Sequence, residues 1–320
     1  MKFELKPTVA ALVGSVAMLG APMAFGAPAV LDTGLVRMGV FDNAGLGALG
    51  VGFDGPDGDA IIRGCLCEGW GAAINGSAGS VYGGGGSGIS TALLTTTDSS
   101  GSDLSSSSVV TMTNGLEVTH KYSSAAGGKL FRVDVSMKNT TAATATDVRY
   151  SRVLDWDVAP GFFGDNFTTV FGGTPTGPGG KVLHTSTNPF AGSDPYILPT
   201  QEQNINVTDS IGDKGGYWVF KFDDLAAGAS VDFTTFIGAD TTVTGLLDAL
   251  LDSGVEAFSY TTGNRISTVD GERAPAFGYG FVGLGLPPVR PPVTVPEPAS
   301  TALLGLGLVA LSGLRRRKVV

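Results

Sequence analysis

The chain has 320 residues, a formal net charge of −9 at pH 7, and a composition of 42% hydrophobic and only 15% charged residues, with 49 glycines. The acidic balance, without a basic patch interleaved with aromatic residues, argues against a nucleic-acid-binding protein, because such a surface must attract phosphates. The hydrophobic fraction is large enough to form a core, and the excess of small polar residues over charged ones is typical of an extracellular surface.

Residues 1–26 have the pattern of a secretory signal peptide. Lys2 and Lys6 form a charged start, residues 9–19 are apolar, and residues 24–26 have the small-x-small pattern of a cleavage site. We expect a signal helix that is cleaved after Gly26, and a cut a few residues later, such as after Ala29, stays open. A permanent membrane helix is less favoured, because the apolar core is too short and prolines follow it.

Residues 27–108 are rich in Gly and Ser and contain short apolar segments, which we interpret as short strands with long loops. The clearest segments are residues 36–41, 46–53 and 89–94. Two low-complexity stretches, residues 83–88 and 99–108, are expected to be mobile loops. We do not expect a phosphate-binding glycine loop there, because no helix is predicted to follow.

Three acidic residues in this region, Asp54, Asp57 and Asp59, lie on a Gly-rich turn. Carboxylate oxygens suit calcium better than a transition metal, but the spacing differs from that of an EF-hand loop. Calcium is therefore a weak alternative to a plain Asp-Gly turn, and no other cofactor is expected. Further acidic residues are similarly weak candidates, namely Asp209, Asp213, Asp223 and Asp224.

Cys65 and Cys67 are the two cysteines of the chain. In an exported protein they meet an oxidising compartment, but in an extended segment residues two apart have Cα atoms about 6.6 Å apart, at the limit of disulfide geometry. A disulfide or another paired structural role is favoured. Free thiols, an intermolecular bridge and a metal site stay open, although a zinc site needs two more ligands and the only histidines are His120 and His184.

The strand pattern sharpens from residue 109. Asn114-Gly115 separates residues 109–113 from 116–122, and this dipeptide is a strong hairpin signal because both residues tolerate positive φ. Residues 130–138 alternate between apolar and polar, as expected for a strand with one buried face. Residues 147–156 alternate too, but Arg152 interrupts their apolar face and therefore needs a partner or an edge position.

Asp155 and Asp157 lie two apart at the end of this strand, so their carboxylates share one face. Such a pair suits glycoside hydrolysis, calcium or sugar binding, or a structural salt bridge to Arg149 or Arg152. We favour a structural role, for instance such a salt bridge, because residues of one strand cannot flank both sides of a sugar ring unaided.

We expect no catalytic residues. The nearest match to a Gly-x-Ser-x-Gly elbow, residues 85–89, has Ile89 in place of the final glycine. A Ser-His-Asp arrangement would require His120 or His184, and His120 lies in a predicted strand where a structural role is expected. The three tryptophans suit either a sugar-stacking platform or, as we favour, the core; they are Trp70, Trp156 and Trp218.

Four more strands and one helix are predicted in the rest of the body. The strands are residues 217–222, 231–237, 255–260 and 276–282. The helix covers residues 242–253, with Asp240 or Thr241 as N-cap, Gly254 at C′, and an apolar stripe that we expect to pack on the sheet edge. The stripe is Val243, Leu246, Leu247, Leu250 and Leu251.

The predicted fold class is therefore mainly β, an antiparallel β-sandwich with one short helix, over residues 27–285 as a single ectodomain. Residues 286–298 contain six prolines and are interpreted as a semi-rigid linker. The last segment, residues 295–320, overlaps the end of this linker.

Residues 295–320 have three parts: Val295-Pro296-Glu297-Pro298, an apolar run over 299–314, and the basic residues Arg315, Arg316, Arg317 and Lys318. At about 1.5 Å per residue the run reaches only about 24 Å of a hydrocarbon core of about 30 Å. This length suits a transient membrane anchor in the form of a hydrophobic helix. The basic residues remain on the cytoplasmic side. Because residues 1–26 contribute +1 and residues 299–320 contribute +4, the remaining body has a net charge near −14.

This order of features resembles the PEP-CTERM sorting signal of exported bacterial proteins. The resemblance implies export through the secretion translocon and an inner-membrane intermediate that is held by the C-terminal segment. It also implies that an exosortase-type transpeptidase recognises Pro296-Glu297-Pro298. The final location would be at the cell surface or outside the cell.

The body is similar to an uncharacterised secreted β domain that is often found with this tail. The similarity depends on the order of short motifs, at residues 65–71, 118–122, 147–152, 155–157, 225–228 and 236–239. That family has no settled activity, so the resemblance implies location and fold but supplies no catalytic residue.

We therefore expect a non-enzymatic exported surface or matrix protein linked to exopolysaccharide or biofilm. The alternative is a secreted glycan-binding or glycan-hydrolysing protein. The first hypothesis is favoured, because the sequence offers a sorting tail and no convergent set of acid, base and nucleophile.

Overall fold

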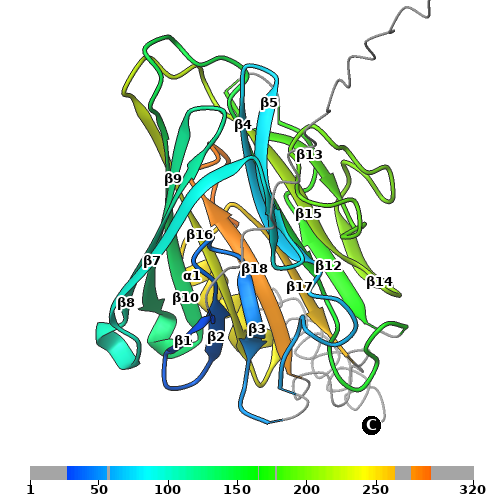
Figure 1. The fold of residues 1–320 in the computed structure, drawn as a ribbon. Helices are drawn as coiled ribbons and strands as arrows, with labels where there is room; N and C mark the ends of the chain where they lie inside the picture. The colour runs from blue at the N-terminus through cyan, green and yellow to red at the C-terminus, as the bar shows by residue number, and fades with distance from the viewer. Residues whose placement is uncertain (1–26, 56–57, 165, 177–178, 264–274, 290–320) are drawn as a thin grey trace, which may run out of the picture.

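The computed structural model describes residues 27–289, apart from 56–57, 165, 177–178 and 264–274. These residues form three antiparallel sheets and a single α-helix (Figure 1), which confirms the predicted mainly-β class. The predicted signal helix, most of the proline-rich linker and the whole segment 295–320 lie outside the described residues.

The two larger sheets have nine and six strands. In spatial order the nine-stranded sheet is β14 (Val207–Ile211), β12 (Phe167–Phe171), β17 (Ala257–Thr262), β18 (Ala276–Val282), β16 (Ser230–Asp240), β10 (Leu130–Asn139), β9 (Leu116–Ala125), β8 (Ser105–Met112) and β7 (Ile89–Asp98). The six-stranded sheet is β13 (Val182–Ser186), β15 (Gly215–Lys221), β11 (Arg149–Asp155), β4 (Glu68–Ile74), β5 (Ser77–Tyr82) and β6 (Gly85–Ser87). The small third sheet is β1 (Ala29–Asp32), β2 (Arg37–Val40) and β3 (Leu46–Gly52).

Aromatic side chains join the inner faces of the two larger sheets. The ring centroids of Tyr150 on β11 and Phe233 on β16 are 4.8 Å apart, and those of Phe220 on β15 and Phe281 on β18 are also 4.8 Å apart. The three tryptophans are 0% exposed, as predicted, so none of them can form a surface platform for a sugar. The core of the sandwich therefore lies between these sheets. In Figure 1 the nine-stranded sheet runs from β7 to β9 on the left to β12 and β14 on the right, and the labels of β4, β5, β13 and β15 in the six-stranded sheet lie toward the upper right.

The helix α1 (Val243–Asp252) forms where predicted, but its N-cap is Thr242, whose Oγ1 accepts a hydrogen bond from the Gly245 amide at 2.9 Å. The prediction of Asp240 or Thr241 as the cap is wrong. Asp240 instead accepts from the amide and hydroxyl of Thr242 and pairs with Lys129 at 2.8 Å. Gly254 follows the helix with φ of +75°, as its predicted C′ position requires.

The expected packing of α1 on a sheet edge is also wrong, because the helix contacts β16 and β18 in the interior of the nine-stranded sheet. The outer face of this sheet carries aromatic side chains that need cover, including Phe236 and Phe258, and α1 buries Leu246 and Leu250 against them. Leu251 of the predicted stripe is only half-buried, and Ala249 is buried instead.

The Asn114-Gly115 hairpin is confirmed and joins β8 to β9, although only Gly115 has positive φ, at 90°. The expected mobile loop over residues 99–108 is wrong, because β8 begins at Ser105. The reason is that Ser106 and Ser108 point into the protein, where the Ser108 hydroxyl donates to the Asp42 carbonyl. Residues 83–88 likewise contain strand β6.

The chain leaves the body at a fixed point. Glu256 accepts hydrogen bonds from the amides of Gly283, Leu284 and Leu286 at 2.7–2.9 Å, and the Val289 amide donates to the Val255 carbonyl. The first residues of the proline-rich linker are therefore held against the body. Within the residues that the structure describes, no helix has the length and apolar character needed to cross a bilayer.

Candidate functional site

The arginines of β11 are paired with acids other than the predicted ones. Arg152 pairs with Glu68 at 2.5 Å, and Arg149 pairs with Asp147 at 3.0 Å. Successive strand residues alternate between faces, so Arg152 and Asp155 point to opposite sides of the sheet. Arg149 shares a face with Asp155 but lies six positions away along the strand. The expected salt bridge to Asp155 or Asp157 does not form.

Asp155 and Asp157 are instead part of a cluster of three carboxylates with Asp213, which we call the tri-aspartate cluster. One oxygen from each of the three side chains lies within 4.8 Å of the other two. Asp155 ends β11, and Asp213 lies in the turn between β14 and β15, two residues before Gly215, the cross-strand partner of Asp155. Antiparallel pairing of β11 with β15 therefore brings the third carboxylate to the pair.

Backbone hydrogen bonds fix two of these residues in place. The Asp155 amide donates to the Cys67 carbonyl at 3.1 Å, and the Asp157 amide donates to the Ala60 carbonyl at 2.8 Å. These bonds orient the backbone but do not involve the carboxylate oxygens. Asp155 and Asp157 are each 1% exposed, yet Oδ1 of Asp155 and both carboxylate oxygens of Asp157 have no hydrogen-bond partner.

The electrostatics of the tri-aspartate cluster follow from burial and like charge. Burial, together with the charge of Asp213, raises the pKa of Asp155 to about 7. Burial, together with Asp155, Asp213 and Asp59, raises the pKa of Asp157 to about 8. Burial also raises the pKa of Asp213, which has the most exposed side chain of the three. None of the ion pairs within the described residues includes a member of this cluster.

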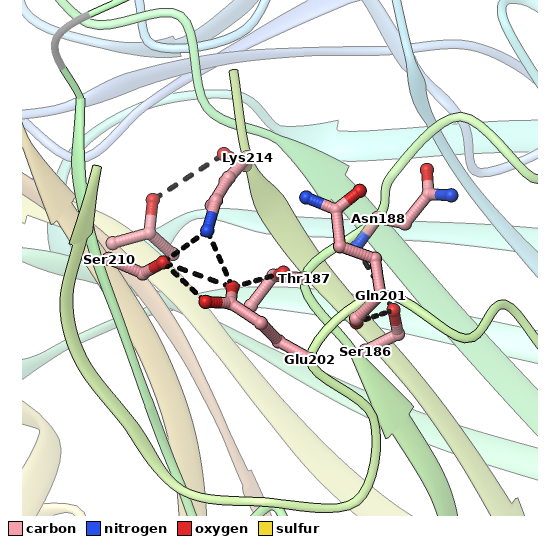
Figure 2. Close-up of polar contacts among 8 residues, drawn as sticks. Ser186, Thr187, Asn188, Gln201, Glu202, Ser210 and Lys214 are labelled. Atoms are coloured by element: carbon pink, nitrogen blue, oxygen red, sulfur yellow. Dashed lines mark hydrogen bonds and ion pairs between the residues drawn. The ribbon is translucent and has the colours of Figure 1, made fainter. Parts of the chain in front are cut away.

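Lys214 follows Asp213 directly, but its ammonium group turns to a different acid. Nζ of Lys214 donates hydrogen bonds to Oε2 of Glu202, at 2.7 Å, and to the Ser210 hydroxyl. Figure 2 shows both contacts. Thr187 and Ser210 also donate to the Glu202 carboxylate. Lys214, Thr187 and Ser210 thus satisfy the Glu202 carboxylate as one hydrogen-bonded group. It is a polar clamp that fixes the loop ahead of β15.

Cys65 and Cys67 form a disulfide with Cα atoms 5.0 Å apart, closer than an extended strand would place them. The chain between them is irregular and precedes β4, so the strand geometry assumed from the sequence does not apply. Sγ of Cys65 lies 3.6 Å from Oδ2 of Asp155. The disulfide thus borders the tri-aspartate cluster, and its sulfurs are not available as thiolate ligands.

The calcium candidates Asp54 and Asp59 have other partners. Asp54 pairs with Arg37, and Oδ1 of Asp59 accepts from the amides of Ile61 and Ile62 at 2.8 and 2.6 Å. Asp57 lies outside the described residues. Asp59 nevertheless lies near the tri-aspartate cluster, since its charge contributes to the raised pKa of Asp157.

The residues considered for nucleophilic catalysis occupy structural positions. Nε2 of His120 lies 3.2 Å from the Tyr150 hydroxyl, and Nε2 of His184 lies 2.7 Å from the Pro199 carbonyl. Ser87 is exposed in the short outer strand β6, which belongs to a hairpin rather than to a strand-to-helix elbow. The buried position of His120, at 1% exposure, agrees with its expected structural role.

The C-terminal segment of the chain matches a known sorting motif. The family model described as the PEP-CTERM protein-sorting motif matches residues 294–318. The match includes the predicted motif Val295-Pro296-Glu297-Pro298 and the four basic residues over 315–318. A search of curated proteins finds no match to the chain. The chain therefore carries the tail of an exported, membrane-processed protein that reaches the cell surface through exosortase processing, while the resemblance of its body stays a prediction.

Proposed function

We propose that this protein is a non-enzymatic component of the cell surface or extracellular matrix that associates with exopolysaccharide. The observation that carries the proposal is the sorting motif over residues 294–318, because it delivers the body to the outside of the cell. The structure supports a binding role through the outer strand β7, which exposes a row of hydroxyl groups to solvent. These belong to Thr91, Thr95 and Thr97, whereas the hydroxyl groups of Ser90 and Thr96 are bonded to the Thr111 carbonyl and to Ser106.

The arrangement of acids favours binding or scaffolding over hydrolysis. A glycosidase places two carboxyl groups on opposite sides of the scissile bond, about 5 Å or more apart. The members of the tri-aspartate cluster converge on one point, and Asp155 and Asp157 are buried. Both histidines have Nε2 engaged with other groups.

Processing is tested with Glu297→Ala, which removes the central carboxylate of the sorting motif. Intact-mass analysis of the wild-type protein from the envelope or medium should show loss of the tail beyond about Pro298, whereas the variant should accumulate as precursor in the inner membrane. Glu117→Ala, on strand β9 of the body, is the matched control and should be processed normally. Wild-type protein recovered outside the cell with its end at Val320 would contradict the sorting route.

The matrix role is tested by deleting the coding sequence and measuring biofilm and capsule. We expect reduced polysaccharide retention that the wild-type chain restores and the Glu297→Ala chain does not. The enzymatic alternative is tested by incubating purified protein with the cell's own exopolysaccharide. Release of reducing ends that Asp155→Asn abolishes would overturn the non-enzymatic proposal.

A further inference from the structure

The tri-aspartate cluster contains buried acidic side chains whose carboxylate oxygens largely lack hydrogen-bond donors among the described residues. Asp157 has two carboxylate oxygens that lack hydrogen-bond partners, although only 1% of the residue is exposed. Buried polar groups in folded proteins are normally hydrogen-bonded, and buried charges are paired or bind metals. The unsatisfied oxygens of Asp155 and Asp157 therefore indicate a partner other than the residues that the structure describes.

Among the residues that the structure describes, the lysine next in sequence to Asp213 does not neutralise the cluster. Lys214 is adjacent to Asp213 in sequence, but its ammonium group is held by Glu202 and Ser210 (Figure 2). The polar clamp thus holds the ammonium group of this lysine at Glu202. Asp59 adds a further negative charge nearby.

The geometry fits a hard divalent cation. Calcium binds oxygen ligands at about 2.3–2.6 Å, so two ligands on opposite sides of the ion are about 4.6–5.2 Å apart and other pairs are closer. The three oxygens of the cluster, all within 4.8 Å of one another, satisfy this limit. An all-carboxylate set favours calcium over zinc or copper, and the neighbouring cysteines are oxidised.

We propose that Asp155, Asp157 and Asp213 bind a calcium ion that ties the end of β11 to the turn before β15. Asp213 is exposed, so the ion enters from its side and completes its coordination with water. The site joins segments that are far apart in the chain and borders the Cys65–Cys67 disulfide. This inference does not depend on the proposed exopolysaccharide association.

The test uses the full-length chain in mild detergent after treatment with a chelator. Terbium replaces calcium, and Trp156, which lies between two of the ligands in sequence, acts as the light-absorbing donor. We expect saturable terbium emission that CaCl2 displaces with a midpoint of about 0.1–1 mM, the range of extracellular calcium modules. MgCl2 should displace terbium only at concentrations about tenfold higher, because magnesium demands stricter octahedral geometry.

Two variants assign the site. Asp157→Asn and the exposed Asp213→Asn should each raise the calcium midpoint at least about tenfold, a loss typical of a missing charged ligand. Asp224→Asn, in an exposed loop, is the matched control and should bind as the wild type does. The proposal is overturned if terbium emission does not saturate, or if both ligand variants retain the midpoint of Asp224→Asn.

Thermal unfolding distinguishes a variant that has lost the calcium site from one that no longer folds. With 10 mM CaCl2 we expect the wild-type Tm to rise by about 3 °C, and the Tm of Asp157→Asn to remain unchanged. Without calcium, Asp157→Asn should be at least as stable as the wild type, because asparagine places no ionisable group in this buried position beside Asp155 and Asp213. If Asp157→Asn does not fold, Asp213→Asn decides the result, and an undiminished calcium-dependent rise in that variant overturns the proposal.

Discussion

Arg152 and Glu68 form an ion pair inside the sandwich, with Nη2 of Arg152 2.5 Å from Oε1 of Glu68 and side-chain exposures of 11% and 1%. The pair joins the neighbouring strands β11 and β4. Oε2 of Glu68 also accepts a hydrogen bond from the Leu46 amide at 2.8 Å, at the start of β3. The same carboxylate therefore connects the six-stranded sheet to the small third sheet.

Removing one partner of this ion pair should destabilise the fold strongly. Glu68→Gln and Arg152→Met each leave one buried charge or polar group without its partner, and we expect a loss of about 3–5 kcal/mol in the free energy of unfolding for each. The control is Arg132→Met, which breaks the exposed pair with Asp134 and should cost less than about 1 kcal/mol. Urea unfolding measures all three. Equal losses for Arg152→Met and Arg132→Met would show that the buried pair has no special role.

His120 should make stability depend on pH. Its ring contacts Trp70 at a centroid distance of 4.5 Å, and burial, together with the charge of Arg152, lowers its pKa to about 3. Between about pH 6.5 and 3 the unfolded chain binds one proton more than the folded chain at this position. Its contribution to stability is therefore lost as pH falls, by about 1.4 kcal/mol per pH unit.

The measurement compares the wild type with His120→Gln at several pH values between 7 and 4. Glutamine keeps a polar side chain that does not titrate, so the stability advantage of the wild type should shrink on acidification. A difference between the two proteins that does not change with pH would contradict the prediction. Global acid effects from other groups are present in both proteins and cancel in the difference.

The polar clamp of Figure 2 should also make stability depend on pH, here through a carboxylic acid, Glu202, instead of a histidine. Burial raises the pKa of Glu202, but the donors Lys214, Thr187 and Ser210 outweigh it and the pKa is lowered overall. A carboxyl with a lowered pKa stabilises the fold above its unfolded pKa, about 4.3, and this contribution is lost as pH falls through the folded pKa.

We therefore expect Glu202→Gln to cost about 1 kcal/mol at pH 7, with allowance for its partial exposure, and almost nothing at pH 3. Denaturant unfolding at both pH values measures this difference. Asp224→Asn, which changes an exposed carboxylate in a loop, is the control for nonspecific charge effects. An equal loss at pH 7 and pH 3 would assign the clamp to packing rather than to charge.

The sequence predicted strands best where one face is buried and the other solvated. In β10 the apolar and polar positions alternate, and the burial of Phe131, Val133, Val135 and Met137 follows that alternation. Strand β4 was missed, because all seven of its residues are buried and its glycines remove the alternating pattern. Gly69 and Gly71 are needed there, since an added Cβ would meet the Val81 and Ser193 carbonyls. Strands β12 to β14 were missed as well, and no alternation was identified in that part of the chain.

The candidate site was predictable only in part. Positions two apart at the end of one strand suggested the pair Asp155 and Asp157, but the proximity of Asp213 depends on the register that places Asp155 opposite Gly215. Periodicity within one segment carries no information about pairing between distant segments. For the same reason the sequence did not indicate Glu68 as the partner of Arg152, because the two residues are brought together by the pairing of β4 with β11.

Glu256 holds the segment through which the chain leaves the sandwich toward the sorting motif. Its two carboxylate oxygens accept the amides of Gly283, Leu284 and Leu286, while Leu286 and Val289 pack against the hydrophobic clusters. Hydrogen bonds to a charged acceptor are stronger than those between neutral groups. One side chain therefore fastens the beginning of the proline-rich linker.

Replacing Glu256 should release this segment without unfolding the sandwich. We expect Glu256→Ala to increase amide hydrogen exchange at residues 283–286 by about 10- to 100-fold, which corresponds to losing hydrogen bonds worth about 1.5–3 kcal/mol. Glu256→Gln, which keeps one acceptor oxygen, should give an intermediate increase. Exchange in β10 provides the internal control and should not change. If residues 283–286 retain wild-type exchange rates in Glu256→Ala, the packing of Leu286 and Val289 alone holds the linker, and the carboxylate is not its anchor.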